Sequence, residues 1–175
     1  AIRYCREADI PFLGICYGLQ LSVVEMARNL LGLRDAHTTE CDPHTNNPVI
    51  DLLPEQEGVE ELGGTMRLGA HTAILEPGSL AHRLYGSEEI RERHRHRWEV
   101  NPDYWDRLEE VGVAFTGRSP DGRLKETLER PDNYFFFATQ FHPEFKSRPW
   151  EPSPPYYGFV RASLDRKLGK PEPDF

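Results

Sequence analysis

The chain has 175 residues, of which 38% are hydrophobic and 29% charged, and its formal net charge is −8. This length is sufficient for one domain with a buried core, and the composition is typical of a globular protein. The acidic balance argues against binding to nucleic acid or to an anionic membrane surface. No apolar run approaches the roughly 20 residues that span a bilayer, so the sequence predicts no membrane partner either.

Three cysteines are present, Cys5, Cys16 and Cys41, and none of them form a C-x-x-C pair. An odd number without paired spacing is typical of free thiols in a reducing compartment, which predicts a cytoplasmic protein. The chain opens without Met, on residues typical of the last turns of a helix. We therefore expect one partial domain over residues 1–175, cut from a longer polypeptide.

The first half of the sequence predicts a strand followed by a helix. Residues 10–15 form a short apolar run, and from Gly18 apolar residues recur at three- and four-residue spacing up to a stop near Gly32. This order is the beginning of a βαβ-type unit and predicts an α/β fold. Residues 35–62 are polar and rich in proline and turn residues, so we expect loops there.

Alternating and helical patterns continue in the second half. The expected elements are strands over 66–74 and 90–100, a short helix over 102–111, a hairpin of 113–117 and 124–128, a strand over 133–141, an extended segment over 152–159 and a helix over 159–168. His94 and His96 fall on the apolar face of their strand, opposite a row of arginines. Because no third ligand accompanies these two histidines, we expect no metal site.

Cys16 lies in the sequence Gly14-Ile15-Cys16-Tyr17-Gly18, between the predicted strand and the predicted helix. A G-x-C-x-G turn of this kind exposes a nucleophile, and small residues at both flanking positions let the strand and helix backbones approach. The helix N-terminus is expected to lower the thiol pKa. An isolated motif is as typical of a buried cysteine between packing glycines, but the strand-turn-helix context favours a nucleophile. Cys5 and Cys41 lack this context, and we interpret both as structural.

A nucleophilic cysteine needs a base and a group that orients the base. His142 ends the most aromatic predicted strand and begins the tripeptide His142-Pro143-Glu144. Glu144 is placed to accept a proton from the imidazole and so to fix its tautomer. From the spacing alone, a catalytic pair and an ordinary loop are equally supported.

Together, "FLGICYGLQ" and "QFHPEF" resemble the class I, triad-type glutamine amidotransferases. The segments "GGTMRLGA", "ERHRHRWEVN" and "FHPEFKSRPWEPSPPYYGF" are similar to the glutamine amidotransferase domain of the CTP synthases. The resemblance implies an open, mostly parallel, flavodoxin-like sheet flanked by helices, with its first strands missing and Cys16 at the end of a central strand. It also implies a catalytic triad of Cys16, His142 and Glu144.

Substrate contacts follow from the same resemblance. Gln20 matches a glutamine-binding position, Glu40 matches a carboxylate that meets the substrate ammonium, and Arg97 matches an arginine that binds the substrate carboxylate. Tyr17 replaces the leucine that is usual in the family, and its backbone N–H is expected to donate to an oxyanion. A second donor is expected from a glycine-rich loop upstream of this chain, so we expect the polypeptide alone to be weakly active or inactive.

The resemblance implies that L-glutamine is hydrolysed and that the ammonia passes to a synthetase domain of the same polypeptide, which converts UTP to CTP. No cofactor is implied for this domain, whereas ATP and Mg²⁺ are implied for the synthetase domain, GTP for allosteric activation and a tetramer for the assembly. No G-x-x-x-x-G-K-[ST] phosphate-binding loop occurs in the chain. Two alternatives remain open: a stand-alone γ-glutamyl hydrolase, and a non-catalytic glutamine-binding or regulatory fragment.

Overall fold

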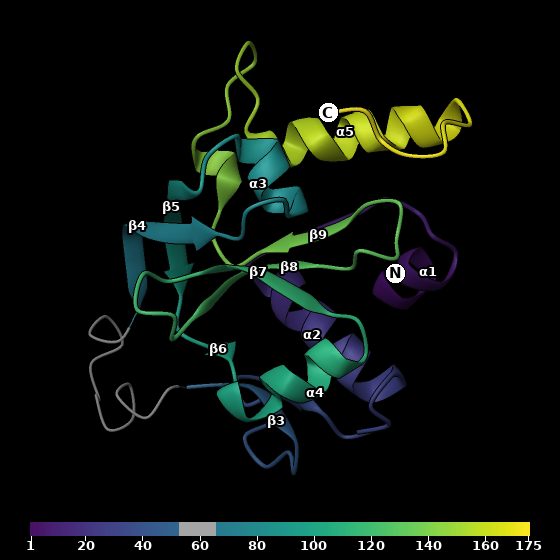
Figure 1. Cartoon of the computed structure of the whole chain (residues 1–175). Helices are drawn as coiled ribbons and strands as arrows, with labels where there is room; N and C mark the ends of the chain where they lie inside the picture. The colour runs from purple at the N-terminus through teal and green to yellow at the C-terminus, as the bar shows by residue number, and fades with distance from the viewer. Residues whose placement is uncertain (53–65) are drawn as a thin grey trace.

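The computed structural model describes residues 1–52 and 66–175, which form an α/β fold with helices on both faces of a mixed sheet (Figure 1). The six-stranded sheet has the order β1-β9-β8-β7-β4-β5, and a small sheet has the order β2-β3-β6. The strands are β1 Phe12–Ile15, β2 His37–Thr38, β3 Pro48–Asp51, β4 Arg67–Leu75, β5 Glu89–His96, β6 Glu99–Val100, β7 Ala114–Arg118, β8 Lys125–Glu129 and β9 Phe136–Thr139. The helices are α1 Ile2–Glu7, α2 Tyr17–Asn29, α3 Leu80–Tyr85, α4 Trp105–Glu110 and α5 Pro154–Lys167, with short 3₁₀ turns η2 Pro102–Tyr104 and η3 Pro143–Phe145.

The sheet confirms the α/β class, but its described strands are mixed rather than mostly parallel. Strands β1 and β9 pair in parallel, whereas β9–β8, β8–β7, β7–β4 and β4–β5 are antiparallel. Short turns join β7 to β8 and β8 to β9, and such turns return the chain as an antiparallel neighbour. Among the described residues β1 is the outer strand of the sheet, although we expected it in the centre.

The parallel pair β1–β9 positions the functional edge of the sheet. Its register places Ile15 opposite Thr139, and the Cys16 N–H donates to the Thr139 carbonyl at 2.7 Å. Both strands therefore end at the same edge. Cys16 leaves β1 there, and Gln140 and then His142 leave β9.

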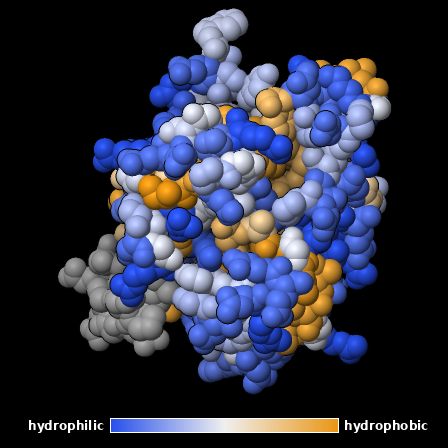
Figure 2. All heavy atoms as spheres, viewed as in Figure 1, coloured by the Kyte–Doolittle hydropathy of each residue, from blue (hydrophilic) through white to orange (hydrophobic). Residues whose placement is uncertain are grey.

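Two apolar clusters hold the helices against the sheet. On one face, α2 buries side chains that recur at helical spacing, among them Leu19, Val23 and Met26. On the other face, α3 and α5 pack against a cluster that includes Phe135 and Phe137. Figure 1 shows these two groups of helices on opposite sides of β7, β8 and β9. The surface seen from the same side is mainly hydrophilic (Figure 2).

Three expectations for individual elements need correction. The region predicted as loops contains β2 and β3, which are too short to show periodicity, while its residues 53–65 lie outside the described part. The strand predicted over 90–100 is interrupted at Arg97 and Trp98, so that β5 and β6 belong to different sheets. Helix α5 already begins at Pro154, because proline is compatible with the first turn of a helix.

The other predicted elements are present, including the hairpin of β7 and β8 and the alternating burial of β5. In the two described stretches, no helix combines the length and the apolar character that crossing a membrane requires.

Candidate active site

Cys16 occupies the strained turn that the sequence predicts between β1 and α2. Its backbone has φ 51° and ψ −100°, a conformation that non-glycine residues rarely adopt. A Cβ at Gly14 would lie 2.9 Å from the backbone carbon of Gly18, so this position has to remain glycine. At Gly18 a Cβ would meet no atom within 4 Å, which corrects our expectation that both flanking residues must be small.

The surroundings of the thiol oppose its ionisation. Burial, together with the negative charges of Glu99 and Glu144, raises the pKa of the Cys16 thiol to about 11. Hydrogen bonds from the Tyr17 backbone N–H and the Gln140 side chain lower the pKa, but by less. We expected the helix N-terminus to lower the thiol pKa, and the structure gives the opposite direction because desolvation of the thiolate outweighs the available donors. Cys16 therefore needs a base to act as a nucleophile near neutral pH.

His142 and Glu144 form a close pair just beyond β9. His142 Nδ1 lies 2.6 Å from Glu144 Oε1, and the His142 backbone N–H is held by the Arg93 carbonyl at 2.8 Å. Because a carboxylate accepts hydrogen bonds, Nδ1 carries the proton and Nε2 is the acceptor. Within the described residues, Nε2 is buried and has no hydrogen-bond partner. The tautomer predicted from the H-P-E tripeptide is thus the one that the geometry favours.

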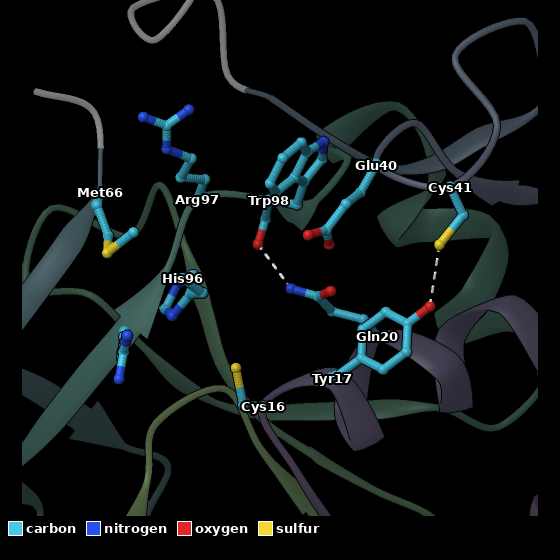
Figure 3. Close-up of a pocket in the computed structure, with 10 residues that line it drawn as sticks. Cys16, Tyr17, Gln20, Glu40, Cys41, Met66, His96, Arg97 and Trp98 are labelled. Atoms are coloured by element: carbon cyan, nitrogen blue, oxygen red, sulfur yellow. Dashed lines mark hydrogen bonds between the residues drawn. The ribbon is translucent and has the colours of Figure 1, made fainter. Parts of the chain in front are cut away.

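A pocket of about 410 Å³ opens above Cys16 (Figure 3). It is lined by Cys16, Tyr17, Gln20, Glu40, Cys41, Met66, Arg95, His96, Arg97 and Trp98. The structure therefore brings together all four residues that the sequence predicts to contact glutamine. His142 and Glu144 are not among the lining residues, although the charge of Glu144 acts on the Cys16 thiol.

Opposite charges occupy different walls of this pocket. In Figure 3 the carboxylate of Glu40 points into the pocket from the loop after β2, whereas Arg97 extends away from Cys16 at the end of β5. The Glu40 loop is tied to the opposite wall by a hydrogen bond of 3.1 Å from Trp98 Nε1 to Thr39 Oγ1. An amino acid with separate ammonium and carboxylate groups is complementary to this arrangement.

Tyr17 and Gln20 make contacts that the sequence did not indicate. The Tyr17 hydroxyl lies 3.2 Å from Cys41 Sγ, and this contact is the main cause that raises the pKa of Tyr17 to about 12. Gln20 Nε2 donates to the Trp98 carbonyl at 2.8 Å, as the dashed line in Figure 3 shows. Cys41, which we interpreted as structural, is instead exposed at the pocket wall.

A buried network of charges supports the pocket from the side of β5. Arg67 lies 3.2 Å from Glu99 and 2.7 Å from Glu126. His96 binds Glu99 at 2.7 Å, and His94 binds Glu126 at 2.8 Å. Buried carboxylates are stable only with such partners, so the network fixes β4, β5, β6 and β8 relative to one another.

The two histidines of β5 are thus bound to carboxylates and do not face a common ligand. Within residues 1–52 and 66–175, no group of three or more His, Cys, Asp or Glu side chains is placed to hold a metal ion.

Gln140 is one residue of this site that sequence reasoning missed, as are the lining residues Met66, Arg95, His96 and Trp98. Gln140 is completely buried at the end of β9, and its Nε2 lies 3.7 Å from Cys16 Sγ. In the sequence, Gln140 was recognisable only as a glutamine side chain between the predicted aromatic strand and His142. A buried polar side chain in such a position needs a partner, and that requirement was the available clue.

Comparison with known proteins gives a consistent family. The family model for glutamine amidotransferase class-I matches residues 1–162. The chain is 61% identical to the CTP synthase of Thermococcus gammatolerans, over 97% of this chain and 32% of that protein. It is 60% identical to the CTP synthase of Archaeoglobus fulgidus, over 94% of this chain and 31% of that protein. The chain therefore spans about a third of the length of the curated relatives it matches.

Solved structures agree with this result. The glutaminase domain of Trypanosoma brucei CTPS with bound acivicin superposes with a TM-score of 0.88 at 33% identity, over 94% of this chain and 64% of that chain. A Thermoplasma acidophilum protein named as a GMP synthase subunit has a TM-score of 0.58 at 16% identity, over 95% of this chain and 64% of that chain, and shares the fold. Because the family model matches almost the whole length of this chain, the chain belongs to the class-I glutamine amidotransferase family.

Proposed function

We propose that this chain, as part of the complete protein that carries it, hydrolyses the side-chain amide of L-glutamine through Cys16, His142 and Glu144. The observation that carries the proposal is the strained cysteine at a sheet edge, below a pocket with separated charges, with an oriented histidine just beyond the end of the neighbouring strand β9. The strong similarity to CTP synthases and to the glutaminase domain of Trypanosoma brucei CTPS supports the same substrate.

Glutamine fits the pocket with its amide toward Cys16 and its ammonium and carboxylate groups at the far end. Glu40 pairs with the ammonium group and Arg97 with the carboxylate. Both charged side chains line the pocket, and Arg97 extends away from the sulfur, as a contact to the far end of the substrate requires (Figure 3). The planar guanidinium suits a carboxylate with two acceptor oxygens.

The chemistry begins with transfer of the thiol proton to His142 Nε2 as Cys16 Sγ attacks the amide carbon. Negative charge develops on the amide oxygen, toward which the Tyr17 N–H can donate. His142 returns the proton to the amide nitrogen, the C–N bond breaks, ammonia leaves and a γ-glutamyl thioester remains. A water molecule then attacks the thioester and gives one proton to His142. Glutamate leaves, and the proton returns to the sulfur.

We further propose that the ammonia is consumed in the amination of UTP to CTP by a synthetase domain of the same polypeptide. ATP with Mg²⁺ would act in that domain, GTP would activate the reaction, and the protein would assemble as a homo-oligomer. The support is the identity of about 60% to CTP synthases of which this chain spans about a third.

The test compares glutamine with ammonia as nitrogen source in the complete protein that carries this chain. Cys16→Ser and His142→Asn should abolish glutamine-dependent CTP formation and leave ammonia-dependent formation intact. Glu40→Gln and Arg97→Met should raise the KM for glutamine about 30-fold or more, because each leaves a charged partner unpaired. Cys5→Ser, which alters a thiol on α1 outside the pocket, is the matched control and should behave as the unmodified protein.

Glutamine-dependent synthesis that survives Cys16→Ser would contradict the proposed nucleophile. Cleavage of γ-glutamyl peptides in preference to glutamine would favour a γ-glutamyl hydrolase. Binding of glutamine without turnover in the complete protein would favour a regulatory module.

A further inference from the structure

Gln140 reaches the reacting sulfur from the side of the sheet. Its position follows from the parallel register, since Cys16 leaves β1 and Gln140 leaves β9 from residues that face each other. The Gln140 backbone N–H is held by the Glu126 carbonyl at 2.8 Å, and the side chain is completely buried. Its amide nitrogen lies 3.7 Å from Cys16 Sγ, within hydrogen-bond range for sulfur. We propose that Gln140 is a further catalytic residue, whose side-chain amide donates a hydrogen bond to the thiolate of Cys16 as it forms.

The orientation of this amide is determined by a chain of contacts that begins at a backbone carbonyl. The Trp98 carbonyl can only accept, so the atom of Gln20 that lies 2.8 Å from it is the amide nitrogen. The same Gln20 nitrogen lies 3.5 Å from Gln140 Oε1, which accepts from it. Gln140 therefore presents its oxygen to Gln20 and its NH₂ group to the sulfur.

A donor at this position answers a specific need of the site. Two carboxylates, Glu99 and Glu144, place negative charge near Cys16, and burial removes water that would otherwise solvate the thiolate. Among the groups that act on the thiol in the described residues, the Tyr17 N–H and the Gln140 amide are the hydrogen-bond donors that favour the charged form. The Tyr17 N–H is also expected to serve the amide oxygen of the substrate, whereas the Gln140 amide remains at the sulfur.

The inference rests on the proposed function, because it assigns a role at the same nucleophile. It differs from a purely structural role in one respect. A structural Gln140 would need only to fill its space and to accept from Gln20. A catalytic Gln140 also needs its NH₂ group, so the two roles separate when the donor alone is removed.

The first experiment removes the donor in Gln140→Glu, which keeps the length of the side chain and an oxygen for Gln20 but adds a negative charge that itself raises the thiol midpoint. The uncharged variant Gln140→Met therefore decides whether the lost donor matters. The rate of alkylation by iodoacetamide is followed at each cysteine over a pH series, by mass spectrometry of peptides. The midpoint for Cys16 should rise by about one pH unit or more, since hydrogen bonds to charged groups are the strong ones. At a pH below the midpoint, alkylation of Cys16 should slow about tenfold, while Cys41 in the same sample serves as an unaltered reference thiol.

Two further variants separate packing from donation. Gln140→Met fills similar space without donor or acceptor and should raise the Cys16 midpoint as Gln140→Glu does. Thr139→Ser removes a buried methyl group next to Gln140 but keeps the hydroxyl that donates to the Phe141 carbonyl, so the Cys16 midpoint should stay unchanged. An unchanged midpoint in Gln140→Met, or an equal rise in Thr139→Ser, overturns the inference.

A measurement on the complete protein without substitutions keeps the proposal testable if the variants do not fold. This stretch has three glutamines, Gln20, Gln56 and Gln140, so ¹⁵N-glutamine labelling confined to it within the complete protein gives three side-chain amide nitrogens to follow by NMR. The Gln140 signal should shift with the same midpoint as the alkylation of Cys16, and absence of that shift overturns the inference. The proposed function fails separately, if Cys16→Ser retains glutamine hydrolysis, whatever the outcome at Gln140.

Discussion

Gly14 and Gly18 lie two residues before and two residues after Cys16, but their surroundings differ, and this difference is directly testable. In Gly14→Ala the new Cβ would lie 2.9 Å from the Gly18 backbone carbon, 3.0 Å from the Gly18 carbonyl oxygen and 3.0 Å from the Phe12 ring. Backbone atoms cannot rotate away as a flexible side chain does, so the end of β1 and the start of α2 must separate. Overpacking of this kind costs about 1–3 kcal/mol. Gly18→Ala meets open space within α2, and we expect it to stabilise the fold by about 0.4–1 kcal/mol.

Equilibrium unfolding in urea measures both variants on one scale. With slopes of about 1–3 kcal/mol per M for small proteins, the two midpoints should fall on opposite sides of that of the unmodified chain. Gly14→Ala should also slow alkylation of Cys16, since the strained turn that presents the thiol depends on the close approach. Equal midpoints for Gly14→Ala and Gly18→Ala would refute the reasoning, because the sequence treats the two glycines alike and only the structure separates them.

Two carboxylates give further predictions. Glu144→Gln keeps an acceptor for His142 but removes a charge, so it should lower the pKa of the Cys16 thiol, which alkylation measures. The same variant should reduce kcat on glutamine about 10²-fold or more in steady-state kinetics. A raised thiol pKa would contradict the argument. Burial would raise the pKa of Glu126, but its hydrogen-bonded and charged partners outweigh burial and lower the pKa from the usual 4.5 to about 2. The free energy of unfolding should therefore hold above pH 4.5 and fall as the pH is lowered toward 2, and this loss should be smaller in Glu126→Gln; an unchanged acid profile in that variant would show that Glu126 is not responsible.

The strained turn at Cys16 was predictable from sequence because its requirements are local. Here the turn needs a small residue two positions before Cys16, which is Gly14, and the hydrophobic period changes from that of a strand to that of a helix at Cys16. The H-P-E tripeptide is similarly local, since Nδ1 of His142 meets a carboxylate only two residues away. Each of these features is complete within a few consecutive residues.

The pocket wall and the sheet order were not predictable in the same way. Strands β2 and β6 have two residues each, which is too short for any periodic signal. The break at Arg97 and Trp98 arises because β6 pairs with β3 in a second sheet, a contact between distant segments. Gln140 is part of the site only because the parallel register places it beside Cys16. These features depend on pairing between strands that are distant along the chain, and such pairing cannot be predicted from a single sequence.

The charge of Glu144 acts on the site in two opposite senses, which explains how a thiol with a raised pKa can serve as a nucleophile. In the proposed mechanism, before the proton moves, the charge of Glu144 disfavours the thiolate. Once the proton has reached His142, the same carboxylate lies 2.6 Å from a cation, and the charges of the thiolate, the imidazolium and the carboxylate alternate in sign. The penalty on the thiolate is thereby offset by the stabilised imidazolium. Ionisation of Cys16 is thus favoured by transfer of the proton to His142 and disfavoured by loss of the proton to water.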